Sequence, residues 1–71
     1  MAGEVRAPLA GKVLSLSVNV GDKVEEDEEV LVIEALKMET VVYAPCAGTL
    51  SEFKVKPGDQ VEEEDLLALI E

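Results

Sequence analysis

The sequence predicts an all-β fold, a barrel or sandwich of about eight short strands. Short runs rich in β-branched residues are separated by proline and glycine turns, and no stretch shows a helical period of useful length. In addition, one strand-rich unit occurs twice. Two copies are too few for a solenoid, so the halves must close on each other, which implies pseudo-two-fold symmetry.

In chain order, the predicted elements begin with a short strand over 4–7, which Pro8 ends. Apolar residues at every second position then predict a strand over 14–20, with one face on the core and the other in water. A Gly-Asp turn and a brief extended piece follow. The β-branched runs at 29–35 and 38–43 predict the two strands of a hairpin.

The repeat relates residues 7–34 to residues 44–71 at a constant offset of 37, without a gap and with 12 of 28 aligned pairs identical. At one turn the second copy has Pro57-Gly58, which suits the centre of a type II turn, so we expect Gly58 to have a positive φ. Segment 35–43 links the two copies. We interpret residues 1–71 as a single domain, because so short a chain cannot divide into two cores.

An acidic balance limits the partners of the chain. Sixteen acidic and six basic residues leave a net charge of −10, which argues against nucleic acid or an anionic membrane as a partner. The acids cluster at 25–29 and 62–65, where we expect solvated turns rather than a docking patch or calcium loops. We therefore expect a soluble, monomeric module without membrane insertion.

The residue inventory also argues against enzyme and metal chemistry. The chain has no histidine, no Ser/His/Asp set and no phosphate-binding glycine loop, so we expect a non-catalytic domain without a metal site. Cys46 is the single cysteine, and we expect it to be a half-buried apolar residue rather than a nucleophile. No export signal is visible, which predicts a cytoplasmic location, or an organelle matrix if the chain is excised from a eukaryotic protein.

Lys37 stands close to the tip of the predicted hairpin, between the two copies. The symmetry places that tip at the opposite end of the domain from the two termini. A presented lysine amine is a nucleophile when it is deprotonated, so it can hold a group as an amide. The alternative is that Lys37 is only a solubilising charge and that Leu36 and Met38 pack under the hairpin.

The segment Glu34-Ala35-Leu36-Lys37-Met38-Glu39 resembles the Ala-Met-Lys-Met attachment sequence of biotin-dependent carboxylases and decarboxylases. The Gly-Asp turns and the Ala-Pro and Ala-Gly pairs of 44–48 are also similar to that family, so the resemblance spans nearly the whole chain. It implies a biotinyl (biotin carboxyl carrier) domain, a barrel-sandwich hybrid of two four-stranded antiparallel sheets. Such a domain shuttles a carboxyl group between the active sites of a carboxylase, decarboxylase or transcarboxylase.

By the same resemblance, Lys37 is the biotin attachment residue and Leu36 and Met38 are its flanking motif. Ala35, Glu34 and Glu39 are then candidates for recognition by a biotin protein ligase, which would act through biotinyl-adenylate. The other implied partners are a biotin carboxylase and a carboxyltransferase or decarboxylase component. Two alternatives stay open: a lipoyl carrier, which typically has Asp-Lys-Ala at this place, and an unmodified structural module of the same shape.

Overall fold

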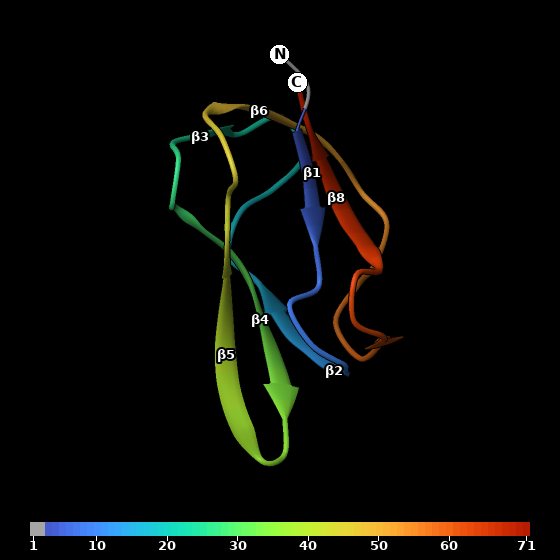
Figure 1. The fold of residues 1–71 in the computed structure, drawn as a ribbon. Coiled ribbons are helices and arrows are strands. Elements are labelled where there is room, and N and C mark those ends of the chain that lie inside the picture. The colour runs from blue at the N-terminus through green and yellow to red at the C-terminus, as the bar shows by residue number, and fades with distance from the viewer. Residues whose placement is uncertain (1–2) are drawn as a thin grey trace.

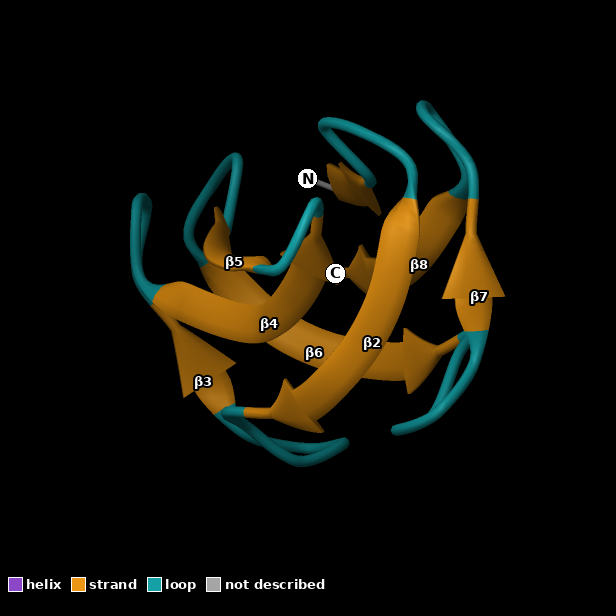
Figure 2. Cartoon of the chain, turned by 90° about the horizontal axis from the view of Figure 1, so that it is seen from below, coloured by secondary structure: helices purple, strands orange, loops and turns teal. Residues whose placement is uncertain are grey.

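The computed structural model describes residues 3–71, which form eight β-strands and no helix, so no helix in this part of the chain could cross a membrane. Figure 2 shows the strands curving around a common interior. The strands are β1 (Gly3–Arg6), β2 (Gly11–Leu16), β3 (Lys23–Val24), β4 (Glu29–Ala35), β5 (Met38–Tyr43), β6 (Gly48–Phe53), β7 (Gln60–Val61) and β8 (Leu66–Ile70). The all-β prediction is confirmed.

Two four-stranded antiparallel sheets make up the fold, with strand orders β1-β8-β6-β3 and β5-β4-β2-β7. Adding the repeat offset of 37 to the bounds of β2 gives those of β6, and the same operation converts β3 into β7. Replacing each strand by its repeat equivalent turns one sheet order into the other. The predicted pseudo-two-fold symmetry is confirmed, and each sheet contains strands from both copies.

An aliphatic core lies between the sheets. Its largest fully buried side chains come from both copies, and Ile33 and Ile70, which the repeat pairs, are both 0% exposed. Among the described residues no polar or charged side chain is buried. The core residues are Val5, Ala7, Val13, Val18, Val24, Val30, Leu31, Ile33, Val42, Ala44, Leu50, Val61, Leu67, Ala68 and Ile70. Cys46 is half-buried and packs against this core, as predicted.

The predicted strand over 14–20 is wrong in its bounds and in half of its buried face. The strand β2 covers Gly11–Leu16, and its fully buried residue is Val13. Leu16 and Val18 lie at the core as predicted, whereas Leu14 and Val20 are exposed. The cause is an extra residue in β2: Val13 pairs with Ile33, but Ser15 pairs with the adjacent Val32. Such a bulge interrupts the alternation of faces, so a strict period of two assigns the wrong side chains to the core.

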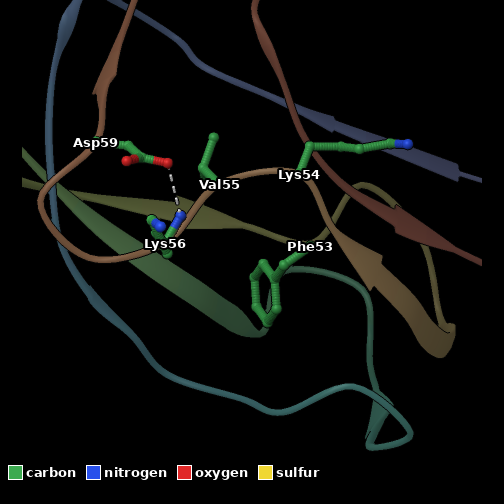
Figure 3. Close-up of a pocket in the computed structure, with 5 residues that line it drawn as sticks. All are labelled: Phe53, Lys54, Val55, Lys56 and Asp59. Carbon is green, nitrogen blue, oxygen red and sulfur yellow. Dashed lines mark hydrogen bonds between the residues drawn. The ribbon is translucent and has the colours of Figure 1, made fainter.

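The Gly-Asp turns are held by their aspartates. Gly58 has φ 97°, as predicted, and the Asp59 backbone N–H donates to the Lys56 carbonyl at 3.1 Å. The Asp59 carboxylate in turn accepts from the Lys56 N–H at 3.1 Å, beside a shallow hollow that Phe53 and Val55 also line (Figure 3). The equivalent turn of the first copy repeats both bonds. The repeated sequence pair therefore closes the same turn twice.

Replacing Gly58 with valine should lower the free energy of unfolding by about 1 kcal/mol or more, because a β-branched residue is strained at this φ. A Cβ at Gly58 would meet no atom within 4 Å, so the loss would report backbone strain and not a clash. Thermal unfolding measures it. Gly58→Asn is the matched control, with a smaller expected loss because asparagine tolerates the left-handed region. Equal melting temperatures for Gly58→Val and the parent would contradict this turn.

The two acidic runs form solvated turns, as predicted. In the first, the Glu25 N–H donates to the Glu28 carboxylate at 2.8 Å, and Asp27 has φ 67°. In the second, the Glu62 N–H donates to the Asp65 carboxylate at 2.8 Å, and Glu64 has φ 74°. All of these residues are exposed. Some acids of the runs therefore have a structural role as caps of their own turns.

The hairpin of β4 and β5 extends from the body at one end. The molecule measures 32 × 18 × 18 Å, so it is elongated. Gly3 pairs with Ile70 at one end, and the β4–β5 turn lies at the other end, as Figure 1 shows. Within residues 3–71, the predicted separation of the hairpin tip from the two ends of the domain is confirmed.

Candidate functional site

Leu36 and Lys37 form a two-residue turn at the tip of the β4–β5 hairpin. The strands pair from Glu29–Tyr43 to Ala35–Met38, which leaves only these two residues outside the ladder. Their φ angles are 52° and 65°, and positive φ at both central residues is the signature of a type I′ turn. This turn type matches the right-handed twist of the strands, so it holds the lysine at a defined point.

The base of the hairpin is anchored in the core. Ile33 is 0% exposed and Ala35 only 9%, so apolar packing reaches the last residue before the turn. The strand β2 approaches closely at Gly11, where a Cβ atom would lie 2.6 Å from the Glu34 carbonyl oxygen and 2.5 Å from Ile33 Cγ2. Only glycine allows this approach. The lysine turn therefore stands on a packed base.

The tip itself is exposed. The exposed fraction is 95% for Leu36 and 70% for Met38, so the alternative in which both pack under the hairpin is wrong. Lys37 is exposed as well and forms no ion pair within residues 3–71. An amine in this position can be reached by an enzyme and modified without disturbing the core.

Of the other predicted site residues, Glu34 and Glu39 pair directly across the two strands, next to the turn, and both are exposed. Ala35 is buried, so its contribution is to packing. The structure therefore brings five of the six predicted residues together on an exposed tip and places one beneath it. Like charges directly opposite each other destabilise a hairpin by a few tenths of a kcal/mol.

A shallow groove beside the lysine was not predicted from the sequence. It is lined by Leu9 and Lys12 from the segment before and within β2, by 34–37 of the hairpin and by Gln60 of β7. Gln60 lines the groove because β7 is the neighbour of β2 in the sheet that contains the hairpin. Only the sheet order, and no local motif, brings this second-copy residue to the tip.

The turn uses residues that are poorly suited to its backbone. Left-handed positions in two-residue hairpins favour asparagine and glycine, whereas a leucine there costs about 1 kcal/mol or more. Leu36 buries almost nothing in return. Strain at an exposed position is typical of a functional site.

Leu36→Asn should therefore raise the free energy of unfolding by about 1 kcal/mol, because asparagine relieves the backbone strain and no packing is lost. Denaturant unfolding measures the change. Met38→Asn is the matched control, since Met38 is also exposed but has no positive φ, and it should not stabilise. A destabilised Leu36→Asn chain would contradict the assigned strain.

Comparison with known proteins identifies relatives of the chain. A family model described as "Biotin-requiring enzyme" matches residues 3–70. The methylmalonyl-CoA carboxyltransferase 1.3S subunit of Propionibacterium freudenreichii is 55% identical over 38 residues, which cover 54% of this chain and 31% of that subunit. The biotin carboxyl carrier protein of Streptococcus mutans is 42% identical over 41 residues, which cover 58% of this chain and 32% of that protein.

Among solved structures, the urea carboxylase of Kluyveromyces lactis matches with a TM-score of 0.93 and 37% identity, over 99% of this chain and 6% of that one. The aligned segments thus cover at most about a third of these relatives. Fold and site define a two-sheet β domain with a lysine presented on a hairpin tip. The chain belongs to the family of biotin-requiring enzymes.

Proposed function

We propose that the chain is a biotin carboxyl carrier domain and that Lys37 holds biotin through an amide bond. The main observation in support is the placement of Lys37 on a two-residue turn at the far end of the molecule from the paired strand ends Gly3 and Ile70. The similarity to the 1.3S subunit of a methylmalonyl-CoA carboxyltransferase and to a biotin carboxyl carrier protein supports the same function.

The residues at the tip fit an attached biotin. The Lys37 amine is exposed and outside any ion pair of residues 3–71, so the acyl carbon of biotinyl-adenylate can be attacked by Nζ, with loss of AMP and of one proton. Attached biotin would accept a carboxyl group at one active site and donate it at another. The chain contributes reach from a packed base, which keeps the arm at a high effective concentration near two active sites.

In this function the chain carries the cofactor and supplies no catalytic group of its own. Partner enzymes, a biotin carboxylase and a carboxyltransferase or decarboxylase, would supply them, and a biotin protein ligase would attach the cofactor. The substrate of the final transfer is chosen by those partners and not by this chain.

A lipoyl carrier is the second candidate, because it would use the same fold and the same lysine. The residues around Lys37 favour biotin. Leu36 stands where an aspartate would flank a lipoyl lysine, and Met38 stands where an alanine would follow it. Both side chains are exposed, so a modifying enzyme can contact them.

The test is the intact mass of the chain after co-expression with a biotin protein ligase and, separately, with a lipoate ligase. The proposal predicts the mass of one biotinyl group in the first case and no addition in the second. A lipoyl addition alone would favour the second candidate. An unmodified chain in both would assign it to a structural module.

A further inference from the structure

An exposed apolar row crosses the outer face of the hairpin sheet. Ser15 of β2 pairs with Val32 of β4, which pairs with Val41 of β5. At the bulge of β2, Leu14 and Ser15 are both exposed. Val32 and Val41 are half-buried, and Tyr43, two residues along the same face of β5, is 56% exposed. We name Leu14, Val32, Val41 and Tyr43 the apolar row. The apolar row crosses β2 and the two strands of the lysine hairpin, β4 and β5, on the side of the sheet that faces solvent.

The other sheet provides an internal comparison, because the strand registers extend the offset of 37 to β5 and β1: Val32 pairs with Val41 as Leu69 pairs with Glu4. The equivalents of Leu14, Val32, Val41 and Tyr43 are Ser51, Leu69, Glu4 and Arg6. Arg6 forms an ion pair with Glu4 at 2.6 Å, and Glu52, which pairs with Leu69, forms one with Lys54 at 3.2 Å. The two sheets share their core pattern, so the difference on their outer faces does not arise from folding requirements.

Acidic side chains border the apolar row on both sides. Glu34 and Glu39 lie opposite each other between the row and the lysine turn, and Glu29 pairs with Tyr43 on the far side. Lys12 is the basic residue of this border and pairs with Glu34. Two directly opposed carboxylates repel each other, and a cationic partner would relieve that repulsion.

The charge pattern selects the occupant of this surface. A second copy would set acid against acid, with each chain carrying a net charge of −10. An enzyme that carboxylates the arm must bind bicarbonate and ATP, both anions, so we expect basic side chains around its active site. An apolar centre with a complementary charged rim is the usual composition of a specific protein interface.

We propose that the apolar row and its acidic border are the docking surface for the biotin carboxylase that loads the arm. This inference rests on the proposed carrier function and adds the surface by which the carrier is held while Lys37 reaches the active site. Docking on the sheet leaves the turn free to move its attached group. It also requires no modification of Lys37, so it can be measured on the unmodified chain.

The test compares the double variant Val41→Thr/Tyr43→Thr with Leu69→Thr, which changes the apolar residue of the opposite sheet that is equivalent to Val32. Threonine has a high strand propensity, so both variants should keep the fold of the parent. Their melting temperatures check this. The unmodified chains are titrated with the biotin carboxylase of the same organism. The double variant should weaken binding by about tenfold, while Leu69→Thr should not change it. When the parent chain and the double variant both carry biotin, their carboxylation by the biotin carboxylase can be compared. The double variant should raise KM for the chain and leave kcat unchanged.

Raised salt should also weaken binding of the parent chain, because the border acts through charge. Equal affinity of the double variant and the parent would overturn the proposal, as would equal weakening by Leu69→Thr or absence of binding by the parent. A dimer that dissociates in the double variant would assign the row to a second copy, which also overturns it. A failure of the proposed carrier function would be seen separately, in the intact mass: the parent chain would gain no biotinyl group.

Discussion

Lys37→Arg is expected to abolish biotin incorporation by a biotin protein ligase while leaving the melting temperature unchanged. Arginine keeps the positive charge and the length of the side chain, but its guanidinium does not act as the acylated amine. The side chain is exposed and forms no ion pair within residues 3–71, so the fold loses nothing. Streptavidin binding and intact mass measure the incorporation.

Lys54→Arg is the matched control for this change. Lys54 is also an exposed lysine, on the second copy, and its ion pair with Glu52 can be kept by arginine. Its variant should incorporate biotin at the parent rate. Biotin retained by Lys37→Arg, or lost by Lys54→Arg, would contradict the assignment of the attachment residue.

Ile33→Ala is expected to lower the free energy of unfolding by about 2–5 kcal/mol, because it leaves a cavity under the lysine hairpin. Ile33 is 0% exposed and faces the core from the strand that leads to the turn. A domain of this size has a total stability of roughly 4–10 kcal/mol, so the variant should approach the limit of folding. Denaturant unfolding at 25 °C measures the loss.

The repeat supplies the control for Ile33. Ile70 occupies the equivalent position and is also 0% exposed, so Ile70→Ala should cost a similar amount. Ile33→Val, which removes one methylene group, should cost only about 0.5–1.5 kcal/mol. A loss below about 1 kcal/mol for Ile33→Ala would contradict the packed base beneath the hairpin.

Much of the fold could be predicted from the sequence because the repeat constrains it twice. The hairpin at 29–35 and 38–43 has the predicted strand bounds, since β-branched residues crowd both sides of the turn. The left-handed conformation of Gly58 was predictable because Pro-Gly specifies its turn chemically. In these places local preference and global symmetry agree.

The bounds of β2 were not predictable, because the bulge beside Val13 has no glycine or other local marker. Apolar residues at every second position continued past the end of the strand, so periodicity assigned Val20 to the core, although it is 60% exposed. A matching register shift occurs in β6 of the second copy. Pairing with the neighbouring strand, and not the residue pattern, determines where each bulge lies.

At the site, the sequence indicates which lysine is presented but not how. The positive φ of Leu36 runs against the preference of leucine, so no propensity argument could anticipate it. The contribution of Gln60 to the groove and the apolar row across three strands also depend on sheet order. These features are contacts between distant segments, which local sequence does not encode.

The position of biotin in the chain after co-expression with a biotin protein ligase tests the attachment residue directly. Trypsin cleaves after unmodified lysine but not after an acylated one, so biotin on Lys37 should give one peptide spanning 24–54 that carries the mass of a biotinyl group. The unmodified chain should instead be cut at Lys37. Biotin mapped to Lys12, Lys23, Lys54 or Lys56, or cleavage at Lys37 in a chain that carries biotin, would contradict attachment of biotin to Lys37.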